Sequence, residues 1–84
     1  TFSFWREGNN EIDLLVEGGA GPLLAIECKS GRTDLRSSTV GAFRKRFPKV
    51  PLIVASLTDR VARRLDIGVE VLPWSEALEQ YQKL

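Results

Sequence analysis

Hydrophobic and polar residues alternate along three early segments of the chain, the pattern of half-buried β-strands. These segments are residues 2–6, 11–17 and 23–29. Gly-Asn-Asn at residues 8–10 separates the first two, and Gly-Gly-Ala-Gly-Pro at residues 18–22 separates the second from the third. Glycine, asparagine and proline favour tight turns. The pattern therefore predicts an antiparallel three-stranded meander.

The next segment changes to a helical period. Within residues 35–47, Val40, Phe43 and Phe47 are spaced three and four apart, which places them on one face of a helix. Pro48 follows directly and would end the helix. We therefore expect a helix over residues 35–47 that packs through its aromatic face.

The last third returns to strands and ends on a helix. Residues 51–56 (PLIVAS) form a continuous apolar run, typical of a strand buried on both faces. Residues 58–65 fit either a short helix or a loop, and residues 69–72 predict a short strand. Pro73 introduces a final helix over residues 74–84.

The resulting order is β-β-β-α-β followed by β-α. A meander followed by a helical crossover into a buried strand predicts an α/β fold with a mixed β-sheet sandwich. We expect the third strand to lie parallel to the strand at residues 51–56.

Composition narrows the class of protein. The 84 residues make a single domain, residues 1–84, and the absence of methionine suggests an excised or truncated piece with sequence upstream. No segment is long and apolar enough to span a membrane. The single cysteine, Cys28, fits a cytoplasmic location, and we expect it to pack in the core beside Ile26. No histidine is present, which excludes Ser-His-Asp and Cys-His catalysis and histidine-ligated zinc.

Charge is divided unevenly along the chain. Residues 1–28 hold five carboxylates and one cation, whereas residues 29–64 hold ten lysines and arginines and two aspartates. A metal-dependent enzyme that acts on a polyanion would need carboxylates for the metal and cations for the phosphates. Ordinary solvated charge explains the same division, and charge alone favours that simpler explanation.

Strand parity brings four charged residues together. Glu11 and Asp13 share one face of their strand, and Glu27 and Lys29 share one face of the next. Pairing through the loop at residues 18–22 places Asp13 opposite Glu27 and Glu11 opposite Lys29. Adjacent carboxylates need a compensating cation. Mg²⁺ accepts one or two protein carboxylates, and a neighbouring lysine can orient an attacking water. The alternative is a solvated sheet face with cross-strand ion pairs.

This arrangement resembles a known superfamily. Asp13, then Glu27-Cys28-Lys29 at the end of the next strand, followed by a helix and a buried strand, resembles the PD-(D/E)XK nucleases, which include restriction endonucleases and Holliday-junction resolvases. More closely, the segments FWRE, NNEIDLLVE, LLAIECKSG, FPKVP, LIVAS and VEVLPW are similar to the nuclease-like C-terminal domain of archaeal-type AAA+ ATPases.

The resemblance implies a restriction-endonuclease-like core in which Asp13 and Glu27 bind Mg²⁺ or Mn²⁺ and Lys29 is catalytic. The N-terminal helix of the superfamily, which often supplies another acidic residue, does not lie within residues 1–84. Glu7 and Glu11 are candidates to replace that acid, and we count Glu11 as a further metal ligand.

Six cations are candidates to contact a DNA backbone. Two lie near the expected site and four at the end of the expected helix: Arg32, Arg36, Arg44, Lys45, Arg46 and Lys49. The four at the helix end also complement the helix dipole, which is the alternative for them. We expect Trp5 and Trp74 to pack in the core rather than to stack on bases.

The sequence thus predicts a metal-dependent DNA endonuclease domain. The alternative is a catalytically inactive module of an AAA+ ATPase that binds nucleic acid or protein. A third possibility is a homodimer or a partner chain that covers an exposed side of the sheet.

Overall fold

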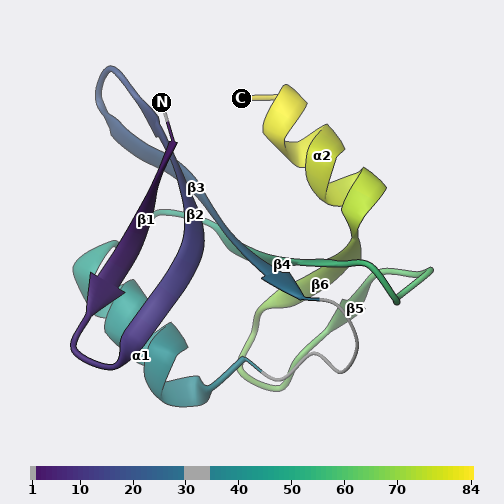
Figure 1. Ribbon diagram of the computed structural model, residues 1–84, viewed down its shortest axis with the longest axis horizontal. Coiled ribbons are helices and arrows are strands. Elements are labelled where there is room, and N and C mark those ends of the chain that lie inside the picture. The colour runs from purple at the N-terminus through teal and green to yellow at the C-terminus, as the bar shows by residue number, and fades with distance from the viewer. Residues whose placement is uncertain (1, 30–34) are drawn as a thin grey trace.

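A computed structural model describes residues 2–29 and 35–84 (Figure 1). The meander consists of β1 (Phe2–Glu7), β2 (Asn10–Gly18) and β3 (Gly21–Lys29). The remaining elements are α1 (Ser37–Arg46), β4 (Leu52–Ser56), β5 (Arg63–Arg64), β6 (Glu70–Pro73) and α2 (Trp74–Gln82).

Six strands of the described chain form one mixed sheet in the order β1-β2-β3-β4-β6-β5. β1, β2 and β3 pair antiparallel, and β4 pairs parallel with both β3 and β6. α1 makes the crossover between β3 and β4 (Figure 1). The α/β class, the meander and the parallel pairing of β3 with β4 are therefore confirmed.

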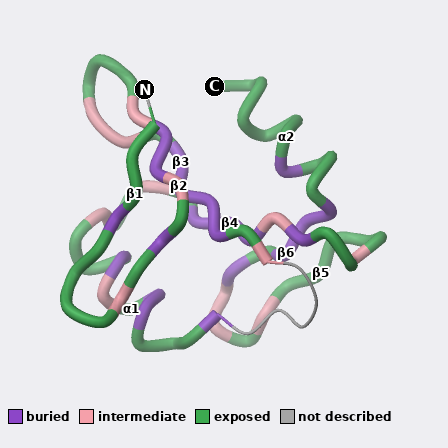
Figure 2. The backbone as a smooth tube through the Cα atoms, viewed as in Figure 1, coloured by how far each residue is buried: buried purple, intermediate pink, exposed green. Residues whose placement is uncertain are grey.

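The helices cover opposite faces of the sheet. Ala25, Val54 and Val71 belong to the core that contains Phe43 of α1. Their neighbours on the same strands form the other core, with Ala77 of α2: Leu24, Ile26, Ile53 and Leu72. This alternation buries β3, β4 and β6 on both faces, as Figure 2 shows at the centre of the sheet.

The α1 side holds the aromatic core. Phe43 is fully buried, and its ring meets Trp5 edge-to-face at 5.3 Å between centroids. Phe47 also packs against Phe43, with 5.2 Å between the ring centroids. The predictions that Phe43 and Phe47 pack together and that Trp5 lies in the core are confirmed.

A β-bulge interrupts the alternation of β2. Ser3 pairs with Leu15 and Trp5 with Ile12, so the two residues between Ile12 and Leu15 oppose Phe4 alone. As a result Ile12 and Leu15 both pack in the core on the α1 side. Strict alternation, from which a common face for Glu11 and Asp13 was predicted, does not hold here.

The α2 side is covered less completely than the sequence predicted. Ala77 is the buried residue of α2, and Trp74 is 55% exposed. Cys28, which shares this side of β3 with Ile26, is exposed as well. The predictions of a buried Cys28 and a buried Trp74 are therefore wrong, because one nine-residue helix cannot cover this face of the sheet.

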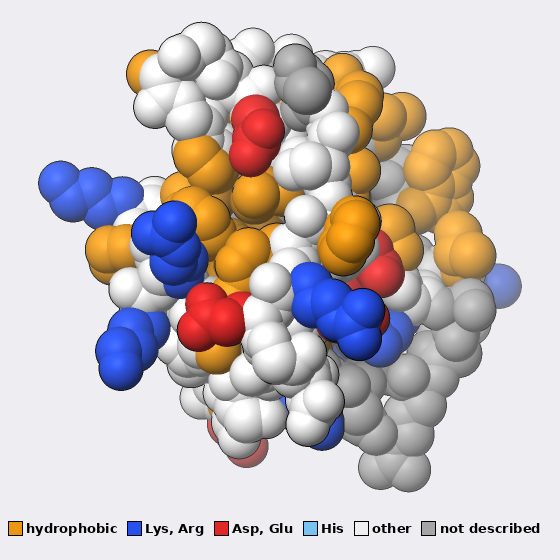
Figure 3. All heavy atoms as spheres, turned by 60° about the vertical axis from the view of Figure 1, so that its left-hand side comes forward, with side chains coloured by type: hydrophobic (Ala, Val, Ile, Leu, Met, Phe, Trp, Pro, Cys, Tyr) orange, Lys and Arg blue, Asp and Glu red, His pale blue; other side chains and the backbone are white. Residues whose placement is uncertain are grey.

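Large hydrophobic side chains consequently reach the surface. Phe2 and Phe4 of the edge strand β1 are 54% and 67% exposed. Hydrophobic side chains gather between charged ones on the face seen in Figure 3. In the segment that the sequence left as helix or loop, the structure forms the two-residue strand β5. No helix among the described residues is long and apolar enough to cross a membrane.

Candidate active site on strands β2 and β3

Two hydrogen bonds join Asp13 of β2 to the Glu27-Cys28 segment of β3. The Asp13 backbone N–H donates to Glu27 Oε1, and the Cys28 backbone N–H donates to Asp13 Oδ2, each at 3.0 Å. These bonds extend a ladder in which Leu14 pairs with Ile26, the register that the sequence predicted for this hairpin. The structure therefore brings the two predicted carboxylates side by side.

Lys29 completes this cluster from the same face of β3. Its Nζ lies 3.3 Å from Glu27 Oε2, and the Glu27 side chain is 10% exposed against 33% for Lys29. Burial raises the pKa of Glu27 above its ordinary value. The nearby Asp13 carboxylate raises it further, while Lys29 and the Asp13 backbone N–H oppose the rise. Glu27 therefore keeps its proton to a higher pH than an exposed glutamate.

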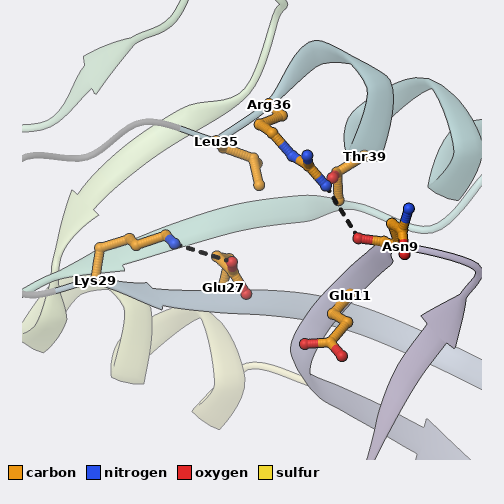
Figure 4. Close-up of a pocket in the computed structure, with 7 residues that line it drawn as sticks. All are labelled: Asn9, Glu11, Glu27, Lys29, Leu35, Arg36 and Thr39. Atoms are coloured by element: carbon orange, nitrogen blue, oxygen red, sulfur yellow. Dashed lines mark hydrogen bonds and ion pairs between the residues drawn. The ribbon is translucent and has the colours of Figure 1, made fainter.

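Glu27 and Lys29 of the cluster line a pocket of about 260 Å³ on the α1 side, whereas Asp13 is not one of the described residues that line it. Its lining residues are Asn9, Glu11, Glu27, Lys29, Leu35, Arg36 and Thr39 (Figure 4). Lys29 and Arg36 both contribute to its walls, so the pocket combines two carboxylates, Glu11 and the buried Glu27, with two cations. Such a lining suits an anion that arrives together with a metal ion.

Glu11 does not join the cluster. Its carboxylate points away from Glu27 and Lys29 (Figure 4) and accepts an ion pair from Arg6, with Arg6 Nε 3.1 Å from Glu11 Oε1. The bulge that follows Ile12 explains the difference, because it changes the face on which the preceding residues of β2 lie. The predicted opposition of Glu11 and Lys29 is not formed.

Two hydrogen bonds that the sequence did not predict fix one wall of the pocket. An Arg36 guanidinium N–H donates to the Asn9 carbonyl oxygen, and the Thr39 hydroxyl donates to Asn10 Oδ1, each at 3.0 Å. They fasten the start of α1 to the turn between β1 and β2. Asparagines in a turn signalled the turn itself, but no local pattern signalled its contact with a helix 27 to 29 residues later.

The other cations that the sequence predicted to contact DNA either lie far from the pocket or already bind backbone carbonyl groups. Arg44 donates to the carbonyl oxygens of Ile67 and Gly68 at 2.8 and 3.1 Å, so its guanidinium ties α1 to the turn before β6. The remaining exposed cations of the helix end are Lys45, Arg46 and Lys49. A ten-residue helix is about 15 Å long, so they lie roughly that far from the pocket. Arg32 lies outside the described residues.

The donor set fits a metal ion that takes few protein ligands. Asp13 and Glu27 each accept a backbone N–H through one carboxylate oxygen. A metal would therefore bind Asp13 Oδ1 and share Glu27 Oε2 with Lys29 Nζ, which lies 3.3 Å from it. Within residues 2–29 and 35–84, no group of three or more His, Cys, Asp or Glu side chains could hold a metal together. Mg²⁺ and its analogues do not require such a cage, because waters and substrate phosphate oxygens supply their other ligands.

Comparison with known proteins gives the chain a family. No curated protein and no solved structure gives a significant match to it. The model of one protein family, described as "Domain of unknown function (DUF4143)", matches residues 1–77. This match covers nearly the whole chain, and the protein therefore belongs to the DUF4143 family.

Proposed function

We propose that this domain is a metal-dependent DNA endonuclease with a PD-(D/E)XK-type site on a restriction-endonuclease-like core. The observation that carries the proposal is the cluster of Asp13, Glu27 and Lys29. An aspartate of β2 is hydrogen-bonded to the segment of β3 that holds the glutamate, and the lysine is ion-paired with that glutamate. All three come from adjacent strands, beside a pocket lined with cations.

The order and direction of the elements support this assignment. An antiparallel meander is followed by a helical crossover, and the next strand lies parallel to β3. This is the arrangement that the resemblance implied for the core. The aspartate stands on the second strand and the Glu-x-Lys pair at the end of the third, as the resemblance also implied.

The chemistry assigns a distinct role to each residue. Asp13 Oδ1 and Glu27 Oε2 would hold Mg²⁺ or Mn²⁺, which when bound lowers the pKa of a coordinated water. Lys29 would orient that water and stabilise the negative charge that builds on the phosphate. Arg36 lines the same pocket and would contact the DNA backbone as a cation.

Cleavage assays test this proposal directly. With Mn²⁺, the wild-type domain should cut supercoiled or branched DNA, and Lys29→Ala should lower the rate by about 100-fold or more, since a positioned proton-transfer group contributes that much. Lys83→Ala, which removes an exposed lysine after α2, is the matched control and should cut normally. Equal cleavage by the wild type and Lys29→Ala would overturn the assignment.

A second candidate function is a non-cleaving module of an AAA+ ATPase that binds nucleic acid or protein. The observation that favours it is the ion pair of Glu11 with Arg6, because it leaves two carboxylates at the cluster where a third was expected. This function predicts salt-dependent DNA binding without metal-dependent cleavage. Calorimetry that shows tight Mn²⁺ binding in the wild type and none in Asp13→Asn would argue against it.

A further inference from the structure

A second cavity adjoins the cluster at the carboxyl ends of β3 and β4. It measures about 330 Å³ and is lined by Cys28, Lys29, Ala55, Leu57 and Trp74. The Leu57 backbone N–H donates to the Lys29 carbonyl oxygen at 3.0 Å, which fixes these two lining residues to each other. Lys29 also lines the pocket that contains Glu27. One lysine is therefore shared by the two cavities.

The walls of this cavity are apolar and open to solvent, and the backbone that carries them is held in place by the sheet and by α2. Leu57 is 67% exposed and Trp74 is 55% exposed. The residue before Trp74, Pro73, is buried and pairs with Ser56 in the sheet, and Ala77 anchors the helix one turn later at 3% exposure. The indole thus stands on a fixed backbone with much of its surface free, which is costly in water unless a ligand covers it.

We infer that this cavity binds an unpaired nucleobase, which stacks on the Trp74 indole and packs against Leu57 next to the phosphate held at Lys29. The inference rests on the proposed function in one respect, that the ligand is nucleic acid. Base–aromatic stacking accepts any base because every base has a π-face. A base inside a duplex is already stacked and cannot enter. The substrate is therefore DNA with single-stranded nucleotides at the cut.

The charge of the lining favours a nucleotide over an apolar protein segment. Among the described residues that line this cavity, Lys29 is the charged one. The adjoining pocket adds the cation of Arg36 beside the carboxylates of Glu11 and Glu27. A nucleotide satisfies both features at once, since its base suits the apolar walls and its phosphate suits the cations. An apolar peptide side chain would use the walls but would bring no anion to Lys29, whose Nζ is ion-paired with Glu27.

Tryptophan fluorescence tests the inference, because the chain has two tryptophans and Trp5 is 7% exposed. In metal-free buffer, dT16 should quench the wild type. The anisotropy of fluorescein-labelled dT16, a readout that does not need Trp74, should show that Trp74→Leu binds about 5- to 150-fold more weakly, the range expected for loss of one stacked base. Trp74→Phe should retain most of the affinity. Phe4→Leu, which removes a 67% exposed aromatic of β1, is the control and should bind normally. A blunt duplex should bind all four proteins alike.

Two results would overturn the inference. One is equal affinity of the wild type and Trp74→Leu for dT16. The other is equal quenching by acrylamide of the fluorescence of the wild type and of Trp74→Leu. That result would show that another part of the protein covers the indole.

The base site and the endonuclease activity can be rejected independently of each other. Trp74-dependent binding without Mn²⁺-dependent cleavage would reject the endonuclease and keep the base site, whereas cleavage with unchanged dT16 binding in Trp74→Leu would reject the base site alone.

Discussion

Glu27 controls the charge of the cluster, because both of its carboxylate oxygens have neighbours. Oε1 accepts the Asp13 backbone N–H and Oε2 faces Lys29 Nζ. Burial nevertheless raises the pKa of Glu27, so ionising this carboxylate in the folded protein is unfavourable relative to the unfolded chain. A bound divalent cation would reverse that cost, which ties the stability of the domain to the occupancy of its site.

Glu27→Gln should therefore become more stabilising as pH rises. Below the ordinary glutamate value of 4.5 the side chain is protonated in both states and contributes no pH dependence. As pH rises through that value and then through the raised pKa of folded Glu27, the unfolded chain loses its proton first, and the wild type loses stability. Glutamine does not ionise, so the free energy of unfolding of Glu27→Gln does not fall in this way.

Urea unfolding between pH 4 and pH 8 in metal-free buffer measures the effect. The unfolding free energy of Glu27→Gln, relative to the wild type, should increase across this range. Glu79→Gln, which alters an exposed carboxylate of α2, is the control. A difference between Glu27→Gln and the wild type that does not change with pH would contradict the role assigned to burial.

At this scale, prediction from sequence worked where the chain geometry is regular. Asp13, Glu27 and Lys29 were placed together because the regular stretch from Leu14 to Val16 pairs with β3 in the predicted register, although a register shift between Val16 and Glu17 separates this stretch from the turn. Glu11 was misplaced because the bulge lies between it and that regular stretch. Trp74 was misplaced because its burial depends on how much of a sheet face one helix covers, which no local pattern records.

At the scale of elements, α1 has different roles at its two ends. Its start faces the pocket through Arg36 and Thr39, and its last turn carries the basic residues. The apolar spacing predicted the helix and its buried face. It could not show which of the basic residues are structural, since the carbonyl groups that Arg44 binds lie 23 and 24 residues later in the chain.

Arg44→Ala should accordingly affect mainly the stability of the domain, and Arg46→Ala mainly the salt dependence of DNA binding. Arg44→Ala should lower the free energy of unfolding by about 1–2 kcal/mol, because two hydrogen bonds from a charged donor are lost, and should leave the salt dependence of DNA binding unchanged. Arg46→Ala removes a cation–π contact with the Phe47 ring and should lower stability less, by about 0.5–1 kcal/mol. It should also reduce the slope of log K against log [salt] by about 0.9, the contribution of one phosphate contact on a duplex.

Chemical denaturation and filter binding from 50 to 200 mM salt separate these outcomes. Lys45→Ala and Lys49→Ala test the two other exposed cations at this end of α1. A reduced salt slope in Arg44→Ala with normal stability would mean that its guanidinium leaves the carbonyls of Ile67 and Gly68 to contact DNA.

At the scale of the whole molecule, the two sides of the sheet offer different chemistry, and Lys29 borders both. The α1 side presents the carboxylates and cations of the pocket, and the α2 side presents the apolar cavity beside Trp74. A DNA strand that crosses the carboxyl ends of β3 and β4 would place its phosphate on one side and its base on the other. This arrangement is consistent with one strand at a time being held for cleavage.

Metal binding should act on the stability of the whole domain. A small domain has a modest core and a thin margin of stability, so a ligand that binds the folded state alone has a large effect. At a Mn²⁺ concentration 100 times its Kd, the gain is about 2.7 kcal/mol. For a domain of this size each kcal/mol raises Tm by about 4–8 °C. Scanning calorimetry should therefore show a Tm increase of roughly 10–20 °C with Mn²⁺, lost in Asp13→Asn and kept in Glu76→Gln, an exposed control on α2. An equal increase in Asp13→Asn would place the bound metal away from β2 and β3.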